Sequence, residues 1–124
     1  MIKILDTTLR DGSYVVDFQF SKKDTREISG VLEGFNVEYI EIGHGLGLGA
    51  YRNEKHRSLC TDREYLEAIS GRKGKAKYGV FFIPGIGNFS DIDAASDSDV
   101  SFIRIGTNAP GRSRPRSGRR GCRR

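Results

Sequence analysis

Short apolar segments alternate along this chain with longer stretches in which apolar residues recur every three or four positions. The short segments are rich in β-branched and aromatic residues, as is typical of β-strands, and they lie at residues 2–5, 37–42, 78–83 and 100–105. The longer stretches predict amphipathic helices at residues 21–35, 61–72 and 88–99. Strands that alternate with helices predict an α/β fold built on a parallel sheet.

Capping residues mark where the predicted helices begin. Ser21 can cap the first helix, and Thr61 can cap the second, where Glu64 completes a capping box three residues later. Ser90 or Asp91 is the predicted cap of the third helix. We expect the first helix to pack on the sheet through one apolar face, made of Ile28, Val31, Leu32 and Phe35.

Two architectures fit this order of elements. One is a small open α/β sheet that is complete within the chain. The other is a partial TIM (β/α)8 barrel that contains the first four βα units and stops at the fourth strand, because a whole barrel needs about 250 residues. The hydrophobic pattern alone leaves both open.

The composition changes abruptly near residue 110. Residues 110–124 contain seven arginines and no acidic residue, whereas residues 1–109 hold 14 basic and 16 acidic side chains, a net charge of −2. A segment of Arg, Gly, Ser and Pro predicts disorder, so we divide the chain into an α/β domain at 1–109 and an Arg-rich tail at 110–124. We expect the tail to be the product of a frameshift near residues 109–112. A basic arm that binds nucleic acid is the alternative, although the body lacks the basic surface of a nucleic-acid-binding domain.

The N-terminal sequence, the apolar stretches and the cysteines indicate in which cellular compartment the protein is expected. The N-terminus does not have the pattern of a signal peptide, and no apolar stretch is long enough to span a membrane. Cys60 and Cys122 lie far apart, without the spacing of a zinc site or a disulfide framework. We therefore expect a cytoplasmic protein that does not bind a membrane.

Polar side chains gather where the predicted strands end. They are Asp6, Thr7, Arg10 and Asp11 after the first strand, Glu41 and His44 after the second, and Arg104 and Thr107 within and after the fourth. Because parallel strands end at one edge of a sheet, these groups could converge on a divalent cation and an anionic substrate. The alternative is structural: Asp6 and Thr7 would shape a turn, while Arg10 and Glu41 would form an ion pair. We expect Arg104 to be a pairing or barrel-interior residue.

The glycine-rich stretch GHGLGLGA, at 43–50, follows a predicted strand. A dinucleotide-binding fingerprint would open a helix here, but a polar loop containing His56 comes next. We expect the glycines to let this loop pass close to a ligand, and we assign no site role to His56.

Four stretches together resemble a known family. They are LDTTLRDG at 5–12, IEIGHGLGLGAYRN at 40–53, FFIPGIGNFSDI at 81–92 and FIRIGT at 102–107. In order and spacing they resemble the DRE-TIM metallolyases, the superfamily of HMG-CoA lyase and the pyruvate carboxyltransferase domains, with the closest likeness to the 4-hydroxy-2-oxovalerate aldolases. The resemblance covers residues 2–107. It implies a (β/α)8 barrel, a Mg²⁺ or Mn²⁺ ion, and cleavage of a small 2-oxo acid through a pyruvate enolate.

The resemblance also implies a role for individual residues. Asp11 matches the metal-ligating aspartate, and Arg10 matches the arginine that holds the 2-oxo acid and stabilises its enolate. Glu41 matches the glutamate that orients this arginine, and His44 matches a loop position that lines the pocket. Thr107 is a further candidate for substrate binding, and the catalytic candidates are Arg10, Glu41, His44 and the nearby Tyr14.

The chain departs from the family pattern at two points. Tyr14 stands where the aldolases usually have a histidine as general base, and a tyrosine with a pKa of about 10 is a poor base at neutral pH. The family's H-x-H metal ligands have no counterpart here. We therefore expect an inactive fragment, or else a half-barrel that assembles with a separate partner chain. For the full-length enzymes, the resemblance implies docking to an aldehyde dehydrogenase.

Overall fold

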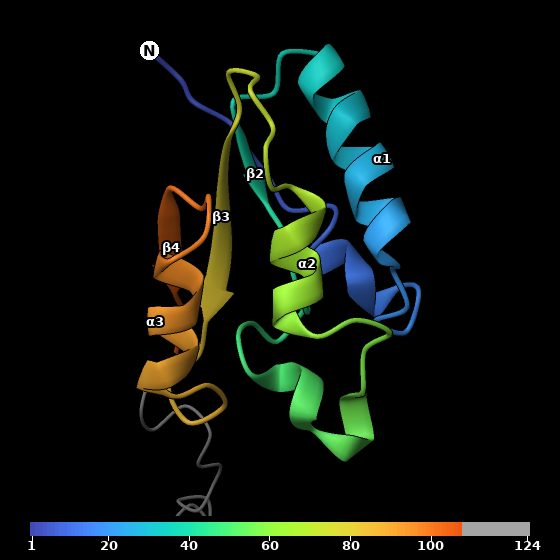
Figure 1. Ribbon diagram of the computed structural model, residues 1–124, viewed down its shortest axis with the longest axis vertical. Coiled ribbons are helices and arrows are strands. Elements are labelled where there is room, and N and C mark those ends of the chain that lie inside the picture. The colour runs from blue at the N-terminus through green and yellow to red at the C-terminus, as the bar shows by residue number, and fades with distance from the viewer. Residues whose placement is uncertain (108–124) are drawn as a thin grey trace, which may run out of the picture.

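Four parallel strands form the sheet of the computed structural model, which describes residues 1–107 (Figure 1). The strands follow the sequence order β1 (Leu5–Asp6), β2 (Tyr39–Glu41), β3 (Lys77–Phe82) and β4 (Phe102–Ile105). The predicted α/β fold with a parallel sheet is confirmed. The expectations about residues 110–124, namely disorder, a frameshift and nucleic-acid binding, lie outside the described residues.

Three α-helices connect the strands, and short 3₁₀ turns shape the loops between them. The helices are α1 (Lys22–Gly34), α2 (Asp62–Ala68) and α3 (Phe89–Ser96), and the turns are η1 (Asp11–Tyr14), η2 (Ala50–Arg52) and η3 (Glu54–His56). No helix within residues 1–107 is long and apolar enough to cross a membrane.

The predicted caps of the first two helices are confirmed, whereas the cap of the third is not. Ser21 caps α1 and Thr61 caps α2, each in a reciprocal capping box. The cap of α3 is Asn88, whose side-chain oxygen accepts the Asp91 backbone N–H, while the Asp91 carboxylate accepts the Asn88 N–H at 2.9 Å. The stretch NFSD at 88–91 contains three residues that can cap a helix. With Asn88 as the N-cap, Asp91 becomes the third residue of the helix, which is the position that completes a capping box.

All three helices pack against one face of the sheet. Alternate residues of a strand point to opposite faces, and the buried face carries Ile40 and Ile42 from β2 and its end, and Tyr78, Val80 and Phe82 from β3. The facing helices contribute Tyr65, Leu66, Ile69 and Ala95, with Ile28, Leu32 and Ile92 partly buried at the margin. The opposite face presents the other set of strand residues, which includes Glu41, Phe81 and Arg104.

The face of α1 that contacts the core differs from the predicted one. Thr25 and Ser29 are buried, and Ile28 and Leu32 pack beside them, but Val31 remains 60% exposed and Phe35 remains 79% exposed. Ser29 and Val31 are about 200° apart around a helix, so they cannot share a face. The Arg26 guanidinium donates to the Ala68 carbonyl at 2.8 Å and turns the polar side of α1 towards α2.

The glycine-rich loop approaches the end of β3 closely. Leu48 donates its backbone N–H to the Phe81 carbonyl at 2.8 Å, and Gly47 beside it has a φ of +91°. A Cβ atom at Gly47 would lie 2.6 Å from the same carbonyl oxygen. The close approach predicted for these glycines is therefore made to the protein's own backbone.

We expect Gly47→Ala to destabilise the fold more than Gly43→Ala does. Both residues have a positive φ, which costs an L-residue about 1–2 kcal/mol, but a Cβ at Gly43 meets no atom within 4 Å. Only the alanine at 47 must also displace the backbone of β3. Urea unfolding of the two variants measures the difference, and equal losses of stability would refute the packing constraint.

Candidate functional site

A tight turn after β1 places Arg10 and Asp11 at the C-terminal edge of the sheet. The Thr7 carbonyl accepts the backbone N–H groups of Arg10 at 3.1 Å and Asp11 at 2.7 Å. The Asp6 carboxylate accepts the Thr8 backbone N–H at 2.9 Å and its hydroxyl at 3.1 Å. The predicted role of Asp6 as a turn former is confirmed, and this turn leads directly into η1.

Arg10 is held in place from three sides. Its Nε donates to Glu41 Oε1 at 2.9 Å, and its Nη1 donates to the Gly45 carbonyl at 2.9 Å. The guanidinium carbon lies 4.2 Å from the centroid of the Phe81 ring, which adds a cation–π contact. The Arg10 side chain is 11% exposed and the Glu41 side chain is fully buried. Charge-assisted hydrogen bonds in such a setting hold a guanidinium rigidly.

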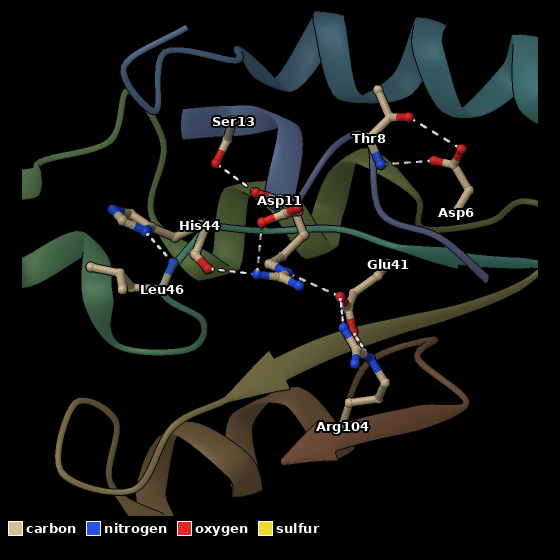
Figure 2. A network of polar contacts seen from close by, with 10 residues as sticks. Asp6, Thr8, Asp11, Ser13, Glu41, His44, Leu46 and Arg104 are labelled. Carbon is tan, nitrogen blue, oxygen red and sulfur yellow. Dashed lines mark hydrogen bonds and ion pairs between the residues drawn. The ribbon is translucent and has the colours of Figure 1, made fainter. Parts of the chain in front are cut away.

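Arg104 reaches the same carboxylate from β4 (Figure 2). Its Nε donates to Glu41 Oε2 at 2.7 Å and its Nη2 donates to Oε1 at 2.8 Å. The hydrogen bond to Glu41 raises the pKa of Arg104, so its charge is permanent. The prediction that Arg104 is a pairing residue is confirmed. The buried carboxylate of Glu41 thus lies between two guanidinium groups, and these three groups together carry one positive charge.

Asp11 lies beside this cluster and faces solvent. Its Oδ1 is 3.6 Å from Arg10 Nη1, and its side chain is 64% exposed. Within residues 1–107, no three His, Cys, Asp or Glu side chains are grouped closely enough to hold a metal ion. Both Glu41 oxygens are occupied by arginines. Mg²⁺ normally has six oxygen ligands, and within residues 1–107 this cluster offers one carboxylate, that of Asp11, as a ligand.

His44 is fully buried, with both ring nitrogens in hydrogen bonds. Nδ1 accepts the Leu46 backbone N–H at 3.0 Å, so Nε2 carries the proton and donates to the His56 carbonyl at 2.5 Å. The ring stacks on Phe18 with a centroid distance of 4.2 Å. Burial lowers the pKa of His44. This histidine fixes the loop whose Gly45 carbonyl holds Arg10, and its catalytic role stays a prediction.

The remaining predicted site residues are more exposed. Tyr14 is 47% exposed and its ring lies edge-on to Phe18, 5.0 Å between centroids. Thr107 is exposed just beyond β4, and within the described residues no hydrogen bond joins it to Arg10 or Asp11. The structure therefore brings Arg10, Asp11 and Glu41 together, with Thr107 outside the cluster.

Two features of the site were not predicted. Phe81 lies under both guanidiniums, and strand alternation in FFIPG would have placed it on the face of Glu41. Asp62, the first residue of α2, accepts the Gly49 backbone N–H at 2.7 Å and so anchors the glycine-rich loop. Burial is the main cause that raises the pKa of Asp62 to about 6. No local sequence signal distinguishes this aspartate from other residues near a helix start.

Comparison with known proteins gives matches over most of the chain. A family described as HMGL-like matches residues 1–114. A 4-hydroxy-2-oxovalerate aldolase of Moorella thermoacetica is 40% identical over 106 residues, which cover 86% of this chain and 31% of that protein. An oxaloacetate decarboxylase of Mycobacterium tuberculosis is 39% identical over 102 residues, 82% of this chain and 30% of that protein. The chain thus spans about a third of the length of these curated relatives.

We expect His44 to remain neutral, with its proton on Nε2, throughout the range from pH 6.5 to pH 8. The buried ring must lose its hydrogen bond to Leu46 to accept a second proton, and burial lowers its pKa below 6.5. Two-bond ¹⁵N–¹H correlation spectra distinguish the tautomers, and the exposed His56 ring is an internal reference. A proton on Nδ1 would contradict the assigned hydrogen bonds.

We expect Asp62→Asn to stabilise the protein at pH 7 but not at pH 4. The folded state binds the Asp62 proton more tightly than the unfolded chain does, so the aspartate lowers stability as the pH rises from 3.8 to about 6. Asparagine keeps an acceptor for Gly49 and removes this cost, a gain of about 1–3 kcal/mol at pH 7.

Chemical denaturation of both proteins at the two pH values measures this gain. Asp24→Asn provides a contrast, because hydrogen bonding to Ser21 lowers the pKa of Asp24 and its charge stabilises the fold at pH 7. A gain in Asp62→Asn that is equal at both pH values would exclude titration as its cause.

Proposed function

The chain belongs to the HMGL-like family, and we propose that it forms the first four βα units of a (β/α)8 barrel that cleaves a carbon–carbon bond of a 2-oxo acid. The parallel order β1-β2-β3-β4, with the helices on one face, supports this placement. In such barrels the C-terminal ends of the strands and the loops that follow them carry the site. Arg10, Glu41 and Arg104 lie at this position, on the face without helices.

The substrates named for the two relatives have one chemical step in common. Both 4-hydroxy-2-oxovalerate and oxaloacetate are 2-oxo acids, and both can break the bond between C3 and C4. The electron pair of that bond moves to C3 and forms the enolate of pyruvate, while acetaldehyde or carbon dioxide leaves. We propose that this chain's site stabilises the same enolate, with a 4-hydroxy-2-oxo acid as the substrate type.

The observation that carries the proposal is the immobilised guanidinium of Arg10. Glu41, the Gly45 carbonyl and Phe81 hold it, while Nη2 has no hydrogen-bond partner within residues 1–107. Two N–H groups are therefore free to donate to a carboxylate and to the oxygen at C2, where negative charge develops. Donors fixed before the reaction stabilise such charge without reorganisation.

The other candidate residues are assigned supporting roles in this proposal. Asp11 would supply one carboxylate ligand to the Mg²⁺ or Mn²⁺ ion that the family resemblance implies, and the other ligands would come from outside residues 1–107. Tyr14 would contact the 4-hydroxyl group, whose proton would pass to solvent water, and Thr107 would contact the substrate after β4. His44 would hold the loop that carries Gly45. Docking to an aldehyde dehydrogenase remains a prediction for full-length enzymes.

We expect the purified chain to bind oxalate, a planar mimic of the pyruvate enolate, with a Kd of about 1 mM or weaker. Arg10→Gln should weaken this binding at least about tenfold, because it removes the free donors. Arg52→Gln is a matched control, because it removes one positive charge from the ion pair between Arg52 of η2 and Asp91 of α3. NMR titration measures both affinities, and equal affinity of Arg10→Gln and the unmodified chain would remove the basis of the proposal.

We also expect no release of pyruvate from 4-hydroxy-2-oxovalerate when Mg²⁺ or Mn²⁺ is added to the chain alone. One carboxylate, Asp11, does not hold a divalent cation tightly by itself. A coupled assay with lactate dehydrogenase detects pyruvate. Metal-dependent turnover that Asp11→Ala abolishes would overturn the expectation of an inactive fragment and would support the assignment of Asp11.

A further inference from the structure

We infer that Arg104 is a positioning residue of this site, which acts on Arg10 through Glu41. The inference rests on the proposed function, because it concerns how Arg10 is aimed at a 2-oxo acid. Arg104 lies on β4, the last strand of the described sheet, and Arg10 lies in the turn after β1. Both donate hydrogen bonds to the Glu41 carboxylate, and Figure 2 shows the contact from Arg104.

The geometry of the two arginine contacts is unequal. Arg104 binds Glu41 as a fork, with one nitrogen on each carboxylate oxygen at 2.7 and 2.8 Å. Arg10 makes a single contact to the carboxylate, from Nε to Oε1 at 2.9 Å. A fork prevents the carboxylate from rotating, whereas a single hydrogen bond does not. Arg104 therefore determines the direction in which Oε1 faces Arg10.

Phe81 adds a second connection between the two arginines. The guanidinium carbon of Arg10 lies 4.2 Å from the centroid of the Phe81 ring, and that of Arg104 lies 5.1 Å from it. Both cations thus rest on one aromatic surface next to one carboxylate. A change in the orientation of Arg104 would alter the support of Arg10 at the ring as well as at Glu41.

The two partners of this ion pair differ in burial. The Arg104 side chain is 43% exposed on β4, whereas the Glu41 side chain is fully buried. Removal of Arg104 would leave Glu41 Oε2 buried without a hydrogen-bond partner, which destabilises a fold. We therefore expect the loss of Arg104 to disturb the site and also to lower the stability of the fold.

The test compares Arg104→Gln with Arg52→Gln, because the two arginines occupy closely similar environments. Arg52 is 44% exposed, binds Asp91 as a fork at 3.0 and 2.7 Å, and lies 5.1 Å from the Tyr51 ring centroid. Arg104→Gln should weaken oxalate binding about tenfold and shift or broaden the Arg10 Nε–H signal in ¹⁵N–¹H spectra. Arg52→Gln should change neither. Arg104→Lys, which keeps the charge but not the fork, should restore only part of the affinity.

A double-mutant cycle separates positioning from direct binding of the anion. If Arg104 acts through Glu41, then adding Arg104→Gln to Glu41→Gln causes no further loss of oxalate affinity. Additive losses, or an unchanged Arg10 Nε–H signal in Arg104→Gln, would overturn the inference. An oxalate affinity of Arg104→Gln within twofold of that of the unmodified chain would also overturn it. Amide dispersion in the same spectra shows whether each variant folds. If Glu41→Gln does not fold, the affinity of Arg104→Lys tests the inference instead, because this variant keeps the charge and loses the fork.

Failure of the proposed function gives a different result. In that case the unmodified chain does not bind oxalate, or Arg10→Gln binds it equally well. The Arg10 Nε–H signal still reports on the positioning by Arg104, because it depends on the hydrogen bond to Glu41 and needs no bound anion.

Discussion

The buried carboxylate of Glu41 is the interaction on which the candidate site depends. A carboxylate removed from water costs several kcal/mol unless it is paired and hydrogen-bonded. Glu41 meets this requirement with Arg10 from the turn after β1 and Arg104 from β4. The pairing is possible only when β1 to β4 lie in their observed register, so the charge cluster depends on the fold. The two guanidiniums exceed the buried carboxylate by one positive charge, which the exposed Asp11 carboxylate, 3.6 Å from Arg10, balances at the edge of the sheet.

The loop between β2 and α2 supports this cluster at some cost to stability. His44 is buried and neutral so that its Nδ1 can accept the Leu46 N–H, and the neighbouring Gly45 carbonyl then faces Arg10. Asp62 is half-buried with a raised pKa, and its ionised form weakens the fold while it holds the Gly49 N–H. Groups that lower stability in order to fix a loop are typical of functional sites.

Local sequence patterns were sufficient to predict the order of the elements and most of their ends. A helix cap depends on groups three residues apart, so Ser21 and Thr61 could be identified from their neighbours. Asn88 was missed because Ser90 and Asp91 beside it are equally good caps in isolation. The apolar face predicted for α1 was partly wrong, because Val31 and Phe35 point away from the core that Ile28 and Leu32 contact.

By itself, the sequence determined the alternation of strands and helices and the polar residues at the strand ends, because both depend on near neighbours along the chain. Only the tertiary structure decided how these residues combine. Glu41 and Arg104 are separated by 63 positions, and their contact arises from a register across β2, β3 and β4 that no local pattern encodes. Phe81 comes under both arginines for the same reason. Spacing tells which side chains share a face, whereas burial and strand register decide what that face meets.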